Sequence, residues 1–296
     1  MKERILGLPR NIFFLGLTSL FNDFSSEMVF AAFPAFFTSV LKSGAASLGL
    51  VDGVAEAVSN FFKIYSGRLS DVSQKRKPLV VWGYIFSVAI RPFYILVSTV
   101  TGVLGLRVFD RVGKGLRDSP RDAIISLSTP KEELGRSFGY HRAMDTTGAI
   151  LGPLAAYFVL RYFPLRFDIL FGTAFLIGIL ALLALFFISD VVVGSSSKRG
   201  IHLDYFRQLP TQFKVTLFAI LILSMGSLPI AVMLLKTRSL GLIVADIPLF
   251  YAVYSISYAA FSIPAGKISD RIGARSVIVI GYLLLVVGYF ILNWAF

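Results

Sequence analysis

Long apolar runs separated by short basic stretches constrain this chain more than any other feature of its sequence. A membrane helix needs about 20 mostly apolar residues to cross about 30 Å of hydrocarbon. We expect nine such helices, over residues 11–41, 47–70, 78–99, 102–124, 137–160, 167–189, 212–235, 247–266 and 276–296. Membrane strands are excluded because these runs are too long for them. The sequence therefore predicts an all-α, polytopic bundle of membrane helices.

Composition supports a protein that lies in the lipid bilayer. Hydrophobic residues make up 56% of the chain and charged residues only 16%, against roughly a quarter in soluble domains. The net charge of +12 could suggest a nucleic-acid partner. We expect none, because the basic residues lie in short stretches between apolar runs rather than on one solvated face. With no cysteine and two histidines, we also expect no metal and no cofactor.

The basic residues also predict the orientation of the chain. If the N-terminus lies inside, most lysines and arginines between the spans lie on that side as well. The outside segments then hold Lys42, Arg161, Arg166, Lys236 and Arg238. This asymmetry follows the positive-inside rule, so we predict a cytoplasmic N-terminus. The short loops suit the plasma membrane of a prokaryote.

A polar, flexible stretch divides the predicted helices into two groups. It contains Gly194, three serines and Lys198-Arg199-Gly200, a composition typical of linkers. We therefore predict a six-helix bundle over residues 1–190, a cytoplasmic linker over 191–211 and three helices of a second, incomplete bundle over 212–296.

A short motif occurs in the second loop of each group. Gly67-Arg68-Leu69-Ser70-Asp71 precedes basic residues that include Arg76, and Gly266-Lys267-Ile268-Ser269-Asp270 precedes Arg271. Parallel internal repeats are a common way to build transporters. The alternative is a chance similarity of two basic loops, which the matched spacing and position disfavour.

Both loops resemble the Gly-x-Leu-x-Asp-basic loop motif of the major facilitator superfamily of secondary transporters. The resemblance implies a cytoplasmic gate formed by the motif residues Gly67, Asp71, Arg76, Gly266, Asp270 and Arg271. Gln74 departs from the pattern, because the family usually has Gly there. In span four, Arg107 matches the family's motif, whereas Asp110 and Arg111 depart from it.

A third stretch, in span five, is similar to the antiporter motif of the same superfamily. Gly148, Gly152 and Pro153 form its Gly-x-x-x-Gly-Pro pattern, although Ala156 and Tyr157 stand where further glycines are usual. Close packing of two helices on small residues is the alternative explanation. Together with the loop motifs, this stretch favours antiport.

The superfamily has twelve helices in two six-helix bundles, with the substrate between them. The resemblance covers the whole chain but implies that three helices of the second bundle are missing. We therefore expect a truncated gene product or a fragment. The alternative to a transporter is a non-transporting remnant, or a membrane interaction or sensor protein. A membrane enzyme is disfavoured, because only His141 with Asp145 suggests an acid–base set.

Several ionisable residues are predicted to lie inside the membrane, where such groups are costly and usually face a cavity or a partner. The candidate cavity residues are Asp23, Glu27, Glu56, Arg107, Arg111, Asp145 and His141. We expect Arg107 and Arg111 to pair with acids among Asp23, Glu27 and Asp145. We expect Lys63, Arg117 and Arg121 to extend toward lipid headgroups instead.

These residues predict proton-coupled transport. Burial disfavours the charged form of a carboxylate, and a nearby arginine favours it. Movement of Arg111 away from Asp23 would thus let the acid take a proton on one side and release it on the other, with His141 as a relay. The alternative is a set of fixed ion pairs that hold the bundle together. We predict proton-coupled efflux of a small amphiphilic or anionic solute by alternating access.

Overall fold

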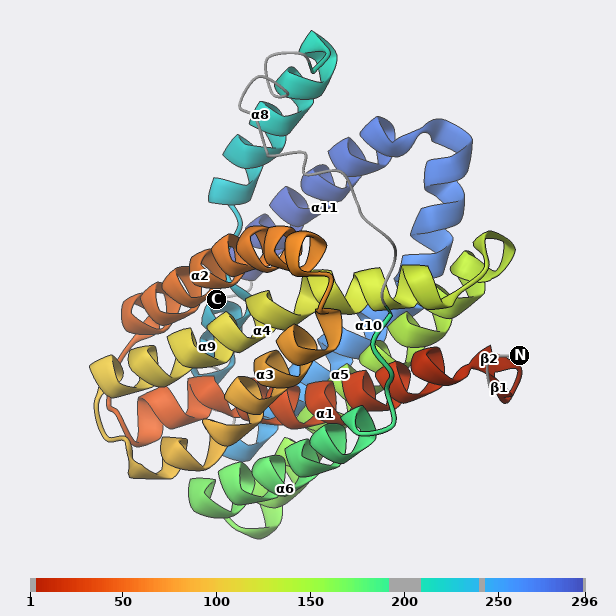
Figure 1. Cartoon of the computed structure of the whole chain (residues 1–296). Helices are drawn as coiled ribbons and strands as arrows, with labels where there is room; N and C mark the ends of the chain where they lie inside the picture. Colours follow the sequence, from red (N-terminus) through yellow and green to blue (C-terminus); the bar gives the residue numbers. More distant parts are fainter. Residues whose placement is uncertain (1–3, 192–208, 240–242, 295–296) are drawn as a thin grey trace. The chain divides into compact units, whose positions relative to one another are not determined.

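The computed structural model describes residues 4–191, 209–239 and 243–294, and helices make up most of it (Figure 1). A short hairpin, β1 (Arg4–Ile5) and β2 (Leu8–Pro9), precedes the first helix. Leu6 and Gly7, which join the two strands, both have positive φ, as a type I′ turn requires. The polytopic all-α prediction is confirmed.

The described helices follow the predicted apolar runs closely. They are α1 (Arg10–Ser39), α2 (Ala45–Ser73), α3 (Arg76–Ala89), α4 (Val100–Ser128), α5 (Leu134–Tyr162), α6 (Phe167–Leu185), α8 (Thr211–Met225), α9 (Ile230–Ser239), α10 (Ile247–Ile272) and α11 (Ala274–Trp294). Short 3₁₀ turns form η1 (Arg91–Leu96), η2 (Lys131–Glu133) and η3 (Val244–Asp246).

Two predicted spans are interrupted. The third leaves the α-helical path after Ala89 and continues as η1, because Pro92 has no N–H to donate to the preceding turn. The single helix predicted over 212–235 is divided into α8 and α9. Gly226 and Pro229 lie in the break, and these residue types are the least favourable in a helix interior.

Five segments of the described chain are long and apolar enough to cross a membrane, judged by length and composition. They are Arg76–Leu96, Lys131–Tyr162, Phe167–Leu185, Thr211–Lys236 and Val244–Ser269. Helices α1, α2 and α4 are longer than four of these five segments, but polar and charged residues interrupt their apolar runs. Those three helices also supply most of the charges discussed below.

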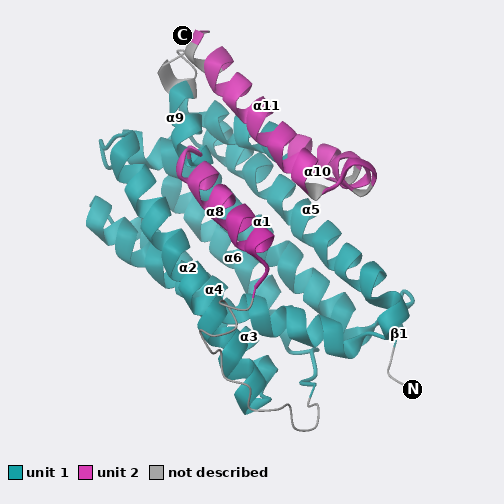
Figure 2. Cartoon of the chain, turned by 90° about the horizontal axis from the view of Figure 1, so that it is seen from above, with its two compact units in different colours: residues 1–198, 229–255 teal, residues 199–228, 256–296 magenta. Residues whose placement is uncertain are grey.

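The chain forms two compact units (Figure 2). The first contains Met1–Lys198 and Pro229–Ser255, and the second contains Arg199–Leu228 and Ile256–Phe296. Within the second, the Leu228 N–H donates to the Tyr289 hydroxyl at 2.8 Å. Residues 192–208 of the predicted linker lie outside the described residues, so the predicted division into bundles at 190 and 212 stays a prediction.

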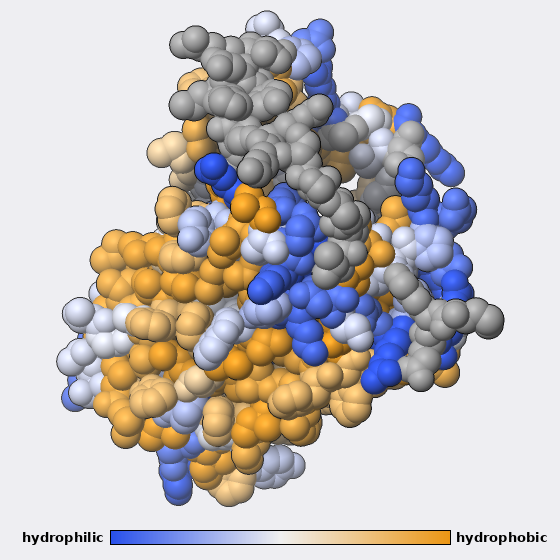
Figure 3. Space-filling view, viewed as in Figure 1, coloured by the Kyte–Doolittle hydropathy of each residue, from blue (hydrophilic) through white to orange (hydrophobic). Residues whose placement is uncertain are grey.

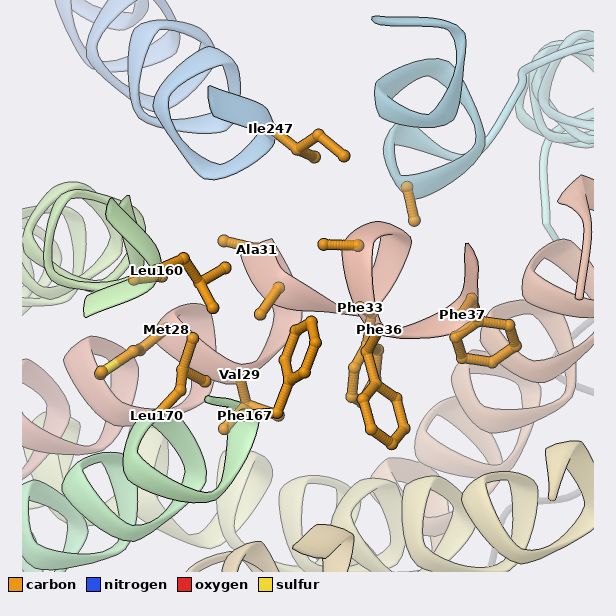
Figure 4. Packing of buried hydrophobic residues seen from close by; sticks show 14 of the residues in the cluster. Met28, Val29, Ala31, Phe33, Phe36, Phe37, Leu160, Phe167, Leu170 and Ile247 are labelled. Carbon is orange, nitrogen blue, oxygen red and sulfur yellow. The ribbon is translucent and has the colours of Figure 1, made fainter. Parts of the chain in front are cut away.

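Two apolar clusters in the first unit enclose a polar layer. One lies along α1 from Met28 to Phe37, where Phe36 packs edge-on against Phe167 and Phe171 at centroid distances of 5.3 and 5.4 Å (Figure 4). The other gathers around Ile12 and Leu15. Between them, α1 presents the buried polar residues Thr18, Ser19, Asn22 and Ser25. The fold thus places polar groups in the middle of a membrane bundle.

Candidate functional site

Helices α1 and α5 pack on two glycines of α5. A Cβ at Gly152 would lie 2.6 Å from the Phe24 carbonyl oxygen and 2.7 Å from the Met28 nitrogen, and Gly148 lies equally close to the α1 backbone. Small residues allow two backbones to approach in this way. The predicted antiporter-like motif, including buried Pro153, is therefore the surface on which α5 meets α1.

This close packing brings two carboxyl groups together. The side chains of Asp23 on α1 and Asp145 on α5 lie within hydrogen-bonding reach of each other. Asn22 Nδ2 donates to Asp23 Oδ1 at 3.1 Å, and Ser19 Oγ donates to Asp145 Oδ1 at 2.8 Å. The other oxygen of Asp145 accepts from Arg142 at 3.0 Å. An ionised carboxylate can only accept, so a hydrogen bond between the two carboxyl groups requires a proton on one of them.

Helices α2 and α4 also approach closely at a glycine. A Cβ at Gly115 of α4 would lie 2.5 Å from both the Ser59 carbonyl oxygen and the Phe62 Cβ of α2. Ser66 Oγ donates to the Gly115 carbonyl oxygen at 2.7 Å. At this distance, charged side chains of the two helices can form ion pairs with each other along the whole contact.

Ion pairs between α2 and α4 repeat at one-turn spacing. The Arg107 guanidinium lies 3.3 Å from Asp52 Oδ1 and 3.4 Å from Asp110 Oδ2. One turn away, Arg111 Nε lies 3.6 Å from Glu56 Oε2. Arg107 is buried and also lies over the Phe30 and Phe33 rings, at 5.0 and 5.1 Å from their centroids.

The partners of these arginines differ from those expected. We predicted pairs with Asp23, Glu27 or Asp145, but the structure gives Asp52 and Glu56 of α2 as partners of Arg107 and Arg111. Asp52 was not among the predicted residues. The sequence did carry a signal, because residues 52 and 56 have the same four-residue spacing as residues 107 and 111, which suits two facing helices.

A second ion-pair network surrounds Asp118 of α4. Lys63 Nζ lies 3.2 Å from one of its oxygens, and Arg121 lies 3.4 Å from the other. Arg117 is buried, donates to the Gly83 carbonyl oxygen at 3.3 Å and lies over the Tyr84 ring. The prediction that Lys63, Arg117 and Arg121 extend to lipid headgroups is wrong, because each finds a nearer partner inside the bundle.

A polar cavity of about 360 Å³ opens among these side chains. Its lining residues are Asp23, Ser26, Glu27, Lys63, Asp110, Arg111, Lys114, Arg117, Asp118, Ser119, Arg121, Asp122, Arg142 and Asp145. Figure 3 shows hydrophilic side chains gathered beside a broad apolar surface on the face where α4 runs. All fourteen lining residues are charged or are serines, so the cavity offers no apolar wall.

The cavity includes four of the seven predicted cavity residues, namely Asp23, Glu27, Arg111 and Asp145. Glu56 reaches it through its ion pair with Arg111. Arg107 and His141 do not line it; His141 is buried on α5, and its Nε2 has no hydrogen-bond partner within the described residues. Glu27 also accepts a hydrogen bond at 2.8 Å from the hydroxyl of Tyr251 on α10.

The first loop motif connects α2 to α3. Gly67 on α2 lies against α4, where a Cβ would be 3.4 Å from the Ser119 Cβ. The exposed Asp71 lies 3.9 Å from the buried guanidinium of Arg76. Asp190, which follows α6, accepts from the backbone N–H groups of Arg76 and Lys77 at 3.3 and 3.2 Å. A carboxylate is favoured at such a helix start, and this role of Asp190 was not predicted.

The second loop motif has the same backbone ending as the first. Gln74 after α2 and Gly273 after α10 both have positive φ, 57° and 85°. Their N–H groups donate to the carbonyl oxygens of Ser70 and Ser269, at 3.1 and 2.9 Å. The glycine that the family usually has at position 74 fits this left-handed conformation best. The Asp270 side chain lies outside the described residues, and Gly266 and Arg271 are exposed.

Known proteins match this chain over most of its length. A sequence model of the Major Facilitator Superfamily matches residues 15–294. The chain belongs to that superfamily. An uncharacterized MFS-type transporter of Methanocaldococcus jannaschii is 37% identical over 265 residues, which cover 84% of this chain and 65% of the relative. The multidrug resistance protein MdtH of Photorhabdus laumondii is 28% identical over 136 residues, covering 46% of this chain and 33% of that protein.

Solved structures share the fold of this chain. A bacterial homolog of the human lysosomal transporter Spinster, in an inward-facing and occupied conformation, aligns with a TM-score of 0.70 at 17% identity. The alignment covers 89% of this chain and 62% of that one. The chain therefore spans less than two thirds of the length of the relatives described here. The fold and the family are shown, and the predicted membrane location agrees with both.

Proposed function

We propose that the protein moves a small solute across the membrane by alternating access and couples this movement to protons. The observation that carries the proposal is the close pair of carboxyl groups, Asp23 and Asp145, which line one cavity inside a membrane bundle. Ionisable groups at such depth mark ion and proton pathways in transporters. The two carboxyl groups lie on the wall of the polar cavity, and this position supports proton exchange next to a bound solute.

The proton on this pair is held by groups that a helix movement would alter. Ser19 of α1 and Arg142 of α5 both donate to Asp145, and the Arg142 side chain is 64% exposed. A shift of α5 against α1 would separate the carboxyl groups and leave both free to ionise. Proton release would then accompany a change in access, which is the linkage that coupled transport requires.

The proposal extends to the direction of transport, the membrane that holds the protein and the gate. Similarity to the multidrug resistance protein MdtH and the antiporter-like sequence pattern of Gly148, Gly152 and Pro153 support antiport and export. We place the protein in the plasma membrane of a prokaryote with its N-terminus in the cytoplasm, because its basic residues gather on one predicted side. The loop motifs around Asp71, Arg76 and Asp270 would form the gate on that side.

A flux assay in proteoliposomes tests the proposal. Liposomes that contain the purified chain and an internal pH-sensitive dye are given gradients of phosphate, succinate or ethidium, and solute-dependent proton movement is recorded. Asp23→Asn should abolish that movement without loss of folded protein. Asp168→Asn is the matched control, because Asp168 is a solvent-exposed acid paired with Arg166.

Unchanged proton movement in Asp23→Asn would overturn the coupling part of the proposal. If the unaltered chain moves none of the solutes, transport itself fails, and the alternative of a non-transporting membrane protein takes its place.

A further inference from the structure

The lining of the cavity restricts the chemistry of what it can hold. Sites for hydrophobic drugs are lined mainly by apolar and aromatic side chains with a few polar groups. Here all fourteen lining residues are charged or serine. An amphiphilic solute would bury its apolar surface against charges and gain little from it. The cavity suits a small hydrophilic solute, whose volume must fit within about 360 Å³.

One cation in this cavity differs from the rest. Lys63 and Arg121 pair with Asp118, Arg111 pairs with Glu56, and Arg142 pairs with Asp145. The remaining arginine, Arg117, donates to a backbone carbonyl group. Lys114 alone among the lining cations makes no hydrogen bond or ion pair with any residue that the structure describes. It lies on α4 between Arg111 and Asp118, one turn from each.

An ammonium group in this setting is costly without a partner, because it is largely removed from water and two of the acids near it already bind other cations. Asp118 already has two cation partners, and Glu56 is used by Arg111. Arg111, one turn away, adds positive potential at the same place. An incoming anionic group would therefore recover interaction energy that the protein itself leaves unused.

We propose that Lys114 binds the carboxylate or phosphate group of a small hydrophilic solute in this cavity. The inference rests on the proposed transport function and narrows its substrate class to anions, away from amphiphilic drugs. The ammonium would donate to the anion as a charge-assisted hydrogen bond. Ser26 and Ser119, which also line the cavity, can donate hydroxyl hydrogen bonds to the rest of the solute.

Equilibrium binding to the purified full chain in nanodiscs tests the proposal. Radiolabelled phosphate and succinate are the anionic probes, and tetraphenylphosphonium is the hydrophobic cation. We expect at least one anion to bind and Lys114→Gln to weaken its binding roughly ten- to hundredfold, the value of one charged hydrogen bond. Lys114→Arg should stay within a few fold of the unaltered chain. Lys131→Gln, at an exposed lysine on η2, is the charge-matched control and should leave binding unchanged.

Thermal unfolding separates binding from a structural role. Because Lys114 makes no hydrogen bond or ion pair within the described part of the chain, Lys114→Gln should unfold at the same temperature as the unaltered chain or higher. The proposal is overturned if neither anion binds, if Lys114→Gln binds anions normally, or if only tetraphenylphosphonium binds. Lys114-dependent binding without proton-coupled flux would refute the transport proposal and leave the anion site standing.

Discussion

Two helix pairs of the first unit are packed alike and charged differently. Helices α1 and α5 meet at Gly148 and Gly152, and α2 and α4 meet at Gly115. Across α1–α5 the ionisable contact joins two acids, Asp23 and Asp145. Across α2–α4 the acids and bases alternate in matched ion pairs. A matched contact resists any change of charge, whereas a contact between two acids can gain or lose a proton without breaking its packing.

The largest expected effect on stability comes from disrupting the close packing at glycine that the two helix pairs share. Gly152→Leu and Gly115→Leu should each lower the free energy of unfolding by about 3 kcal/mol or prevent folding, because the new side chain meets backbone atoms of the facing helix. Gly105→Ala is the control, since nothing lies within 4 Å of its Cβ position. Thermal unfolding in detergent measures all three. An unchanged midpoint in either leucine variant would show that the helices do not approach so closely.

A buried ion pair between α2 and α4 should contribute more to stability than a partly exposed one. Arg107→Gln should cost about 3 kcal/mol of unfolding free energy, because it leaves the buried carboxylates of Asp52 and Asp110 without their cation. Arg111→Gln should cost less than about 1 kcal/mol, because the Glu56 side chain is 49% exposed and water replaces the lost partner. Denaturant titration of both variants checks the difference. Equal losses would mean that the ion pairs are equally solvated.

A third pair of variants compares the two contacts directly. Asp118→Asn should cost about 2 kcal/mol, because Lys63 loses its charged partner and Arg121 keeps only Asp122. Asp145→Asn should cost less than about 1 kcal/mol, because the Arg142 partner that it loses is largely exposed and the amide oxygen still accepts from Ser19. The same denaturant titration applies. A larger loss in Asp145→Asn would indicate that α1–α5 depends on charge as much as α2–α4 does.

Two buried serines test single hydrogen bonds, one in each helix contact. Ser66→Ala removes the hydrogen bond to the Gly115 carbonyl oxygen and should cost about 1 kcal/mol. Ser19→Ala removes a donor from Asp145 and should cost a similar amount in stability. Only the second should also move the pH dependence of solute-coupled proton flux, measured in proteoliposomes. If the pH dependence of the flux also shifts in Ser66→Ala, the α2–α4 contact takes part in proton exchange as well.

The sequence predicted which residues lie in the bundle better than it predicted which residues meet. Apolar runs and the glycine motif located the helices and the α1–α5 contact, because both depend on local composition and spacing. Asp23, Glu27, Arg111 and Asp145 could be assigned to a cavity for the same reason, since charges avoid lipid.

Partners across helices were harder to predict. The pairing of Arg107 with Asp52 depends on the rotation of α4 against α2, which no spacing within one helix determines. Asp190 was overlooked because it sits beyond the end of a span, and its role at the start of α3 appears only when the chain ends of α6 and α3 meet. The division of the seventh span at Pro229 was visible in the sequence but was read as part of a continuous helix.

The polar α2–α4 contact has a consequence for how the protein enters the membrane during synthesis. Helix α4 carries Arg107, Asp110, Arg111, Lys114, Arg117 and Asp118 within its central part. Each charge at the centre of an isolated helix opposes insertion by about 3 kcal/mol, so α4 on its own would be rejected by the lipid. We therefore expect it to enter the lipid together with α2, whose Asp52, Glu56 and Lys63 pair with its charges. Membrane insertion of this bundle would then involve several helices at once, and the ion pairs between them would determine which helices insert together.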